Sequence, residues 1–94
     1  MHTLINPATE EVVAHVPRTT PAEVDKAVAR ARAAFPAWRA VSPGDRARLL
    51  RRFGDLVDAH IEELAQLEVR NSGHTISNAR WEAGNVRDVL HFYA

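Results

Sequence analysis

Five histidines are the side chains best suited to acid–base or metal chemistry in this 94-residue chain, because imidazole titrates close to neutral pH. They stand at positions 2, 15, 60, 74 and 91. None lies at a spacing typical of metal ligands. The segment 60–64 superficially resembles the zinc metalloprotease motif, but it lacks the second histidine four residues on. We therefore expect surface or partly buried histidines and no metal site built from them.

Nucleophiles and phosphate-binding loops are also missing. The chain has no cysteine, which removes disulfides, thiolate metal sites and a thiol nucleophile. The serines have no G-x-S-x-G context, and the four glycines form neither a G-x-G-x-x-G string nor a P-loop. Glu62 and Glu63 are adjacent, so on a helix they point to different sides. The sequence predicts no catalytic residue and no cofactor-binding residue.

A dense group of arginines is the most prominent charged feature. Four fall within seven consecutive residues: Arg46, Arg48, Arg51 and Arg52. Guanidinium groups bind phosphate and carboxylate well, so the group could contact a charged partner. Local ion pairs on a solvated face are favoured instead by three aspartates at helical spacings, Asp45, Asp55 and Asp58. We prefer the solvated face, because the arginines are not interleaved with aromatic residues and the chain is not basic.

Composition and charge fit one small globular unit at most. Apolar residues make up 46% of the chain, and twelve basic residues balance twelve acidic ones. This balance gives no general attraction to nucleic acid or to an anionic membrane. No apolar run approaches the ~20 residues of a membrane-spanning helix. The first residues do not resemble a signal peptide, so a cytoplasmic location is the expectation.

Two short strands should open the chain. Residues 1–5 are mostly apolar, residues 6–11 are typical of a turn, and the β-branched segment 12–16 ends before Pro17. The pattern predicts a β arm over residues 1–16. Such a pair is marginal alone and needs another element to pack on.

Helices should follow, so the predicted fold class is mostly α with a short N-terminal β arm. Three helices are predicted, near 20–35, 43–70 and 75–93. A threonine N-cap followed by a proline and a glutamate marks the first start, and Pro36 should stop that helix. Ser42 begins a second start signal of the same kind. The second helix should end before Asn71-Ser72-Gly73, where glycine or asparagine can take a left-handed conformation.

The third predicted helix carries more apolar side chains than one neighbour can cover. Trp81 and Phe92 flank a line formed by Ile76, Ala79, Ala83, Val86, Leu90 and Tyr93. A helix that is apolar over a wide arc packs on more than one neighbour. We therefore expect the free chain to be loosely packed, or to self-associate through the end of this helix.

Six short motifs occur in order along the chain, at spacings that match those of a known family. Asn6-Pro7-Ala8-Thr9 with Glu11 and Val12 is similar to an N-P-x-T-G-E-V/L opening, and residues 24–35 are similar to V-D-x-A-V-x-A-A-R-x-A-F. Trp38 follows, and residues 46–56 match R-x-x-x-L-x-x-x-A/G-D-L. Residues 63–68, Gly73 and the closing Phe92-Tyr93-Ala94 continue in register. Together these motifs cover the chain and resemble the N-terminal segment of the NAD(P)-dependent aldehyde dehydrogenase superfamily, which has an α/β fold.

Two positions depart from that pattern. Glu10 stands where the family usually has glycine, and a positive φ there would cost on the order of 1 kcal/mol. His74-Thr75 replaces the usual Lys-Pro after the glycine. Neither departure touches catalytic chemistry.

The resemblance implies oxidation of an aldehyde to a carboxylate with NAD or NADP. Family members are several times longer and have a Rossmann-like cofactor domain, a catalytic domain with a cysteine nucleophile and a glutamate base, and an oligomerisation arm. None of these groups lies in this chain. The implied role of the segment is therefore scaffold beside the cofactor domain, inactive alone, with the remainder of the enzyme as its partner.

One ligand position is also implied by the resemblance. Some members hold a monovalent cation with main-chain oxygens just before the N-P motif and an acidic side chain just before the glycine that ends the second helix. These positions fall here on Leu4, Ile5 and Asn71. Asparagine offers a neutral oxygen, so we expect any binding to be weaker than with a carboxylate.

Two other functions remain open. A non-enzymatic helical interaction module would bury Trp81, Leu90, Phe92 and Tyr93 among its own helices, whereas a fragment would leave them exposed. A nucleic-acid binder acting through residues 46–52 is disfavoured by the neutral net charge.

Overall fold

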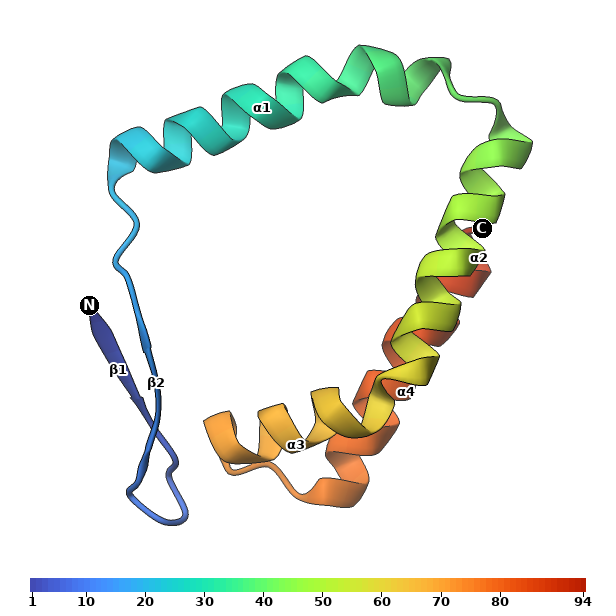
Figure 1. The fold of residues 1–94 in the computed structure, drawn as a ribbon. Coiled ribbons are helices and arrows are strands. Elements are labelled where there is room, and N and C mark those ends of the chain that lie inside the picture. Colours follow the sequence, from blue (N-terminus) through green and yellow to red (C-terminus); the bar gives the residue numbers. More distant parts are fainter.

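The fold is mostly helical with a two-stranded arm, as predicted. A computed structural model describes all 94 residues, Met1–Ala94. The elements in order are β1 (His2–Ile5), β2 (Val12–Val16), α1 (Pro21–Ala40), α2 (Pro43–Ala59), α3 (Ile61–Ser72) and α4 (Ile76–Tyr93), and they form an open arch (Figure 1). None of the helices is both long and apolar enough to cross a membrane.

The β arm is an antiparallel pair closed by a tight turn. His2 lies opposite Val16, and the register shifts between Leu4 and Ile5. In the turn, the Asn6 side chain accepts a hydrogen bond from the Ala8 N–H at 2.9 Å. Glu10 has φ 64°, so a non-glycine residue does occupy a left-handed position here. The backbone cost inferred from the sequence, about 1 kcal/mol, therefore applies.

The first helix starts as predicted but ends later. Thr20 and Glu23 form a capping box, in which the Glu23 N–H donates to the Thr20 hydroxyl at 3.3 Å and the Thr20 N–H donates to the Glu23 carboxylate at 2.7 Å. The expected stop at Pro36 is wrong, because α1 continues to Ala40. A proline removes one N–H donor and strains one turn, which a helix can absorb as a kink. The alanines around Pro36 favour this continuation.

The predicted helix 43–70 is in fact two helices, so the chain has four instead of three. His60 leaves the helical conformation with φ −115° and ψ 14°, and its N–H donates to the Val57 carbonyl at 3.0 Å. Figure 1 shows α3 turning from the end of α2 toward the β arm. The break lets both helices pack on α4. Gly73 ends α3 with φ 75°, which confirms the predicted left-handed end.

The core is small and consists of small side chains. The buried residues are Gly54, Val57, Ala65, Ala79, Ala83 and Gly84. At the closest approach of α2 and α4, a Cβ added to Gly54 would lie 2.5 Å from the ring of His91. Short side chains thus let the helices approach closely, but they bury little apolar surface.

The chain does not close around its own core. Its radius of gyration is 17.1 Å, whereas a compact domain of this length has about 12 Å. Its thinnest extent, 14 Å, matches two packed helices, whose axes lie ~8–10 Å apart and whose Cα atoms lie ~2.3 Å from each axis. Helix α1 contributes no buried residue. The arch is therefore two helices thick where α4 packs on α2 and α3, and only one helix thick at α1.

Candidate functional site

The predicted cation-binding positions come together only in part. Leu4 and Asn71 line one hollow of about 310 Å³ between the β arm and α3, whereas Ile5 does not line it. The sequence reasoning missed Glu68, which also lines this hollow and carries its one carboxylate. Glu68 could have been predicted from the sequence, because it precedes Asn71 by three residues and residues three apart on a helix share a face. The Ser72 hydroxyl lies 2.9 Å from the Glu68 carboxylate and donates to it.

The turn of the β arm is held against the end of α3. A Cβ added to Gly73 would lie 2.9 Å from Cγ of Pro7, so this close approach requires glycine at position 73. This contact joins two of the motifs that carry the family resemblance.

Three of the histidines lie close to carboxylates. His60 Nδ1 lies 2.9 Å from the Glu63 carboxylate, and His91 Nε2 lies 3.1 Å from that of Asp55. His74 Nε2 is 3.2 Å from Glu82, but the angle does not make a hydrogen bond. No three His, Cys, Asp or Glu side chains gather into a group that could hold a metal ion.

The arginine cluster makes fewer local pairs than the sequence indicates. Arg48 pairs with Asp45 on the same helix, as the helical spacing predicted. Asp55 and Asp58 instead reach across to α4, where they meet His91 and Arg87. The aspartates of α2 thus mainly join two helices.

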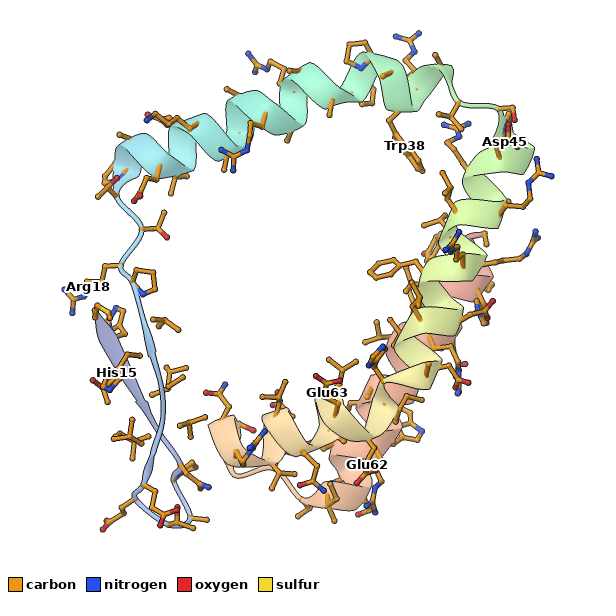
Figure 2. All side chains as sticks on the ribbon, viewed as in Figure 1. His15, Arg18, Trp38, Asp45, Glu62 and Glu63 are labelled. Atoms are coloured by element: carbon orange, nitrogen blue, oxygen red, sulfur yellow. The ribbon has the colours of Figure 1, made fainter.

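A third inter-helix pair joins α3 to α4. The Arg80 guanidinium donates two hydrogen bonds to the Glu62 carboxylate, each at 2.8 Å. These bonds, together with one from Gln66, lower the pKa of Glu62 to about 2. Figure 2 shows Glu62 and Glu63 on different sides of α3, as expected for adjacent helical residues.

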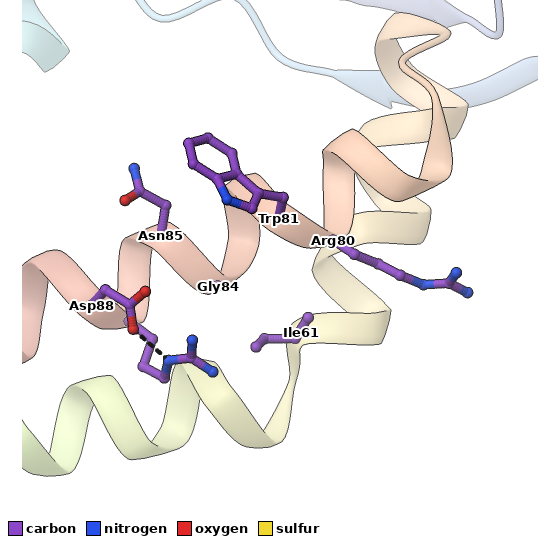
Figure 3. Close-up of a pocket in the computed structure, with 7 residues that line it drawn as sticks. Ile61, Arg80, Trp81, Gly84, Asn85 and Asp88 are labelled. Carbon is purple, nitrogen blue, oxygen red and sulfur yellow. Dashed lines mark hydrogen bonds and ion pairs between the residues drawn. The ribbon is translucent and has the colours of Figure 1, made fainter.

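The outer face of α4 carries a shallow polar hollow of about 200 Å³ beside Ile61. Trp81 and Asn85 project from the same side of α4, away from Ile61 (Figure 3). The two arginines of this hollow are already held by carboxylates, Arg80 by Glu62 and Arg87 by Asp58 and Asp88. The pairing raises the pKa of Arg87 above its usual range.

The residues of this chain do not fit NAD or NADP. A dinucleotide site needs a parallel βαβ unit and a glycine-rich turn, whereas the two strands here are antiparallel. The cations that line the outer hollow are occupied by ion pairs. No catalytic step through the cofactor can therefore be assigned to these residues.

The most extensive functional feature is exposed apolar surface. Phe92 is 81% exposed, Tyr93 74% and Trp81 70%. A groove of about 490 Å³ runs between α2, α3 and α4, with Phe53, Leu64 and Val86 among its apolar lining. Apolar surface of this kind marks an interaction face.

The chain is similar to known proteins over nearly its whole length. Residues 2–94 match the family model described as aldehyde dehydrogenase family. The chain belongs to the aldehyde dehydrogenase family. It is 47% identical over 75 residues to 2-aminomuconic semialdehyde dehydrogenase of Bos taurus, covering 80% of this chain and 15% of that protein. It is 42% identical over 94 residues to betaine aldehyde dehydrogenase of Cereibacter sphaeroides, covering 97% of this chain and 19% of that protein.

A solved structure shares the arrangement of this segment. The crystal structure of PnpE in complex with nicotinamide adenine dinucleotide superposes with a TM-score of 0.91 at 34% identity. The match covers 97% of this chain and 19% of that chain. The open arch is thus the form that the corresponding fifth of a larger enzyme adopts.

Proposed function

We propose that this chain is the N-terminal scaffold segment of an NAD(P)-dependent aldehyde dehydrogenase, an oxidoreductase that converts an aldehyde to a carboxylate, and that the segment alone is inactive. The observation that carries the proposal is the match of nearly the whole chain to the aldehyde dehydrogenase family model and, at a TM-score of 0.91, to 19% of the PnpE chain. Nucleophile, base and cofactor site would be supplied by the remainder of the enzyme, and this segment would position that remainder.

The exposed apolar groups support such a scaffold role. Burying one large side chain is worth roughly 1.5–3 kcal/mol, so an arch with many of them exposed gains most of its stability from a partner. The groove over α2–α4 and the end of α4 are the faces that the remainder would cover. Self-association through the end of α4 is the alternative way for a free chain to cover them.

A self-contained interaction module is the second candidate. Such a module would bury Trp81, Leu90, Phe92 and Tyr93 within its own helices. Leu90 is half-buried, but the three aromatic side chains are more than two-thirds exposed. This exposure favours the scaffold segment.

A weak monovalent cation site at Leu4, Ile5 and Asn71 is a further part of the proposal. The hollow shared by Leu4 and Asn71 supports it, and Glu68 would supply the negative charge that Asn71 lacks. A cytoplasmic location is also proposed for the enzyme.

A chimera tests the scaffold role. The matching segment of the Cereibacter sphaeroides betaine aldehyde dehydrogenase is replaced by this chain, and betaine-aldehyde-dependent NAD(P) reduction is measured. The chimera should turn over, whereas the purified 94-residue chain should not. An insoluble or inactive chimera beside a fully active parent would contradict the proposal. So would sustained turnover by the isolated chain after contaminating enzyme is excluded.

A further inference from the structure

The corner between α1 and α2 contains a cation without a partner. Three titratable side chains of the chain are half-buried: Arg46, His74 and Arg87. Arg87 is held by Asp58 and Asp88, and His74 lies 3.2 Å from Glu82. Arg46 makes no ion pair and no side-chain hydrogen bond, because the neighbouring Asp45 pairs with Arg48 instead. Arg46 is thus the half-buried charge that lacks an opposite charge.

The side chains around Arg46 are mostly apolar, and none of them is acidic. It lines a hollow of about 380 Å³ together with Trp38, Pro43, Ala47, Leu50, Tyr93 and Ala94. Figure 2 shows Trp38 pointing from α1 toward the inside of the arch, beside the first turns of α2. Polar groups of this lining include the guanidinium, the indole N–H and the phenol, all of which can donate hydrogen bonds. No side chain of the hollow therefore carries negative charge. Ala94 has a main-chain carboxylate only while it is the last residue, and in the chimera described above it is an ordinary peptide unit.

A carboxylate fits this combination. A guanidinium that has lost part of its water regains the most from a carboxylate, which it can bind with two parallel hydrogen bonds. Arg46 also lies in the first turn of α2, where the positive end of the helix favours an anion. The apolar walls suit the methylene groups of an acidic side chain better than a fully hydrated ion.

We propose that this corner hollow binds an aspartate or glutamate side chain of the polypeptide that packs against the α1–α2 corner, with Arg46 as its counter-ion. The identity of that polypeptide, the remainder of an aldehyde dehydrogenase, rests on the proposed function. The pair would fix the angle between α1 and α2, which otherwise share little contact.

The chimera provides the test, because the corner is covered there. Arg46→Met should lower its melting temperature by at least about 3 °C, since the carboxylate is left without a partner. Arg46→Lys keeps the charge but not the paired geometry, so a smaller loss is expected. Arg51→Met is the matched control, because Arg51 lies on the same helix, is exposed and has no ion pair. Its melting temperature should stay within about 1 °C of the parent chimera.

A crystal structure of the chimera, grown without acetate, formate or citrate, gives the direct readout. A side-chain carboxylate within about 4 Å of the Arg46 guanidinium is expected. A guanidinium that faces only water, a small anion or main-chain carbonyls would overturn the proposal, as would equal melting of the Arg46→Met and Arg51→Met chimeras. If the unmodified chimera has no activity, the proposed function fails. If it is active but Arg46 has no carboxylate, only this inference fails.

Discussion

Gly73 is the residue at which two requirements for glycine coincide. Its φ of 75° favours glycine, and a Cβ would lie 2.9 Å from Cγ of Pro7. We predict that Gly73→Ala destabilises the chimera by about 1–3 kcal/mol, from backbone strain plus the contact with the turn. Thermal unfolding measures the loss.

Gly44→Ala is the control for this prediction, because a Cβ at Gly44 meets nothing within 4 Å. It should leave the unfolding temperature unchanged or raise it slightly, since alanine favours a helix. Equal unfolding temperatures of the Gly73→Ala and Gly44→Ala chimeras would show that the turn of the β arm does not contact the end of α3 closely.

At the scale of elements, the Glu62–Arg80 pair makes the α3–α4 contact sensitive to acid. The folded-state pKa of Glu62 is lowered to about 2 from its usual 4.5, chiefly by the hydrogen bond from Arg80. A lowered carboxyl pKa stabilises the fold above the unfolded pKa, and this stabilisation is lost as the pH falls from about 4.5 toward about 2. We predict that the 94-residue chain loses helical circular dichroism over this range.

Substitutions separate this pair from the other carboxylates. Glu62→Gln should have lower helical content than the parent near pH 6 and should lose less signal on acidification. Asp25→Asn on α1 removes a carboxylate that makes no ion pair, so its acid transition should match that of the parent. If Glu62→Gln and the parent show the same transition, the inter-helix pair does not contribute.

The helix ends show which parts of the fold can be predicted from sequence. Capping signals at Thr20 and Ser42 and the glycine at 73 predicted element ends correctly, because each depends on neighbouring residues. The break at His60 was missed because no glycine or proline marks it, and it arises from packing of α2 and α3 on α4. Pro36 was overestimated as a stop signal. The partners of Asp55 and Asp58 could not be predicted either, because they lie 36 and 29 residues further along the chain and depend on how the helices pack.

For the whole molecule, exposed aromatic groups determine how the free chain behaves. The rings of Phe92 and Tyr93 pack edge to face, with centres 5.1 Å apart, at the exposed end of α4. We predict that the purified chain is loosely packed or self-associates through this end, which sedimentation velocity over a concentration series and binding of a hydrophobic dye would detect. Phe92→Ser should shift the chain toward monomer, whereas Phe35→Ser on α1 should not. A monomer with a sharp, concentration-independent thermal transition and no dye binding would refute this.

The isolation of α1 has a consequence for amide hydrogen exchange. No residue of this 20-residue helix is buried, so in the free chain only its own backbone bonds protect it. A lone helix of this length opens on a microsecond timescale, whereas opening of α4 must also separate it from α2 and α3. Deuterium should therefore enter α1 much faster than α4, and a bound partner should slow α1 most, because α1 gains all of its tertiary protection from outside the chain.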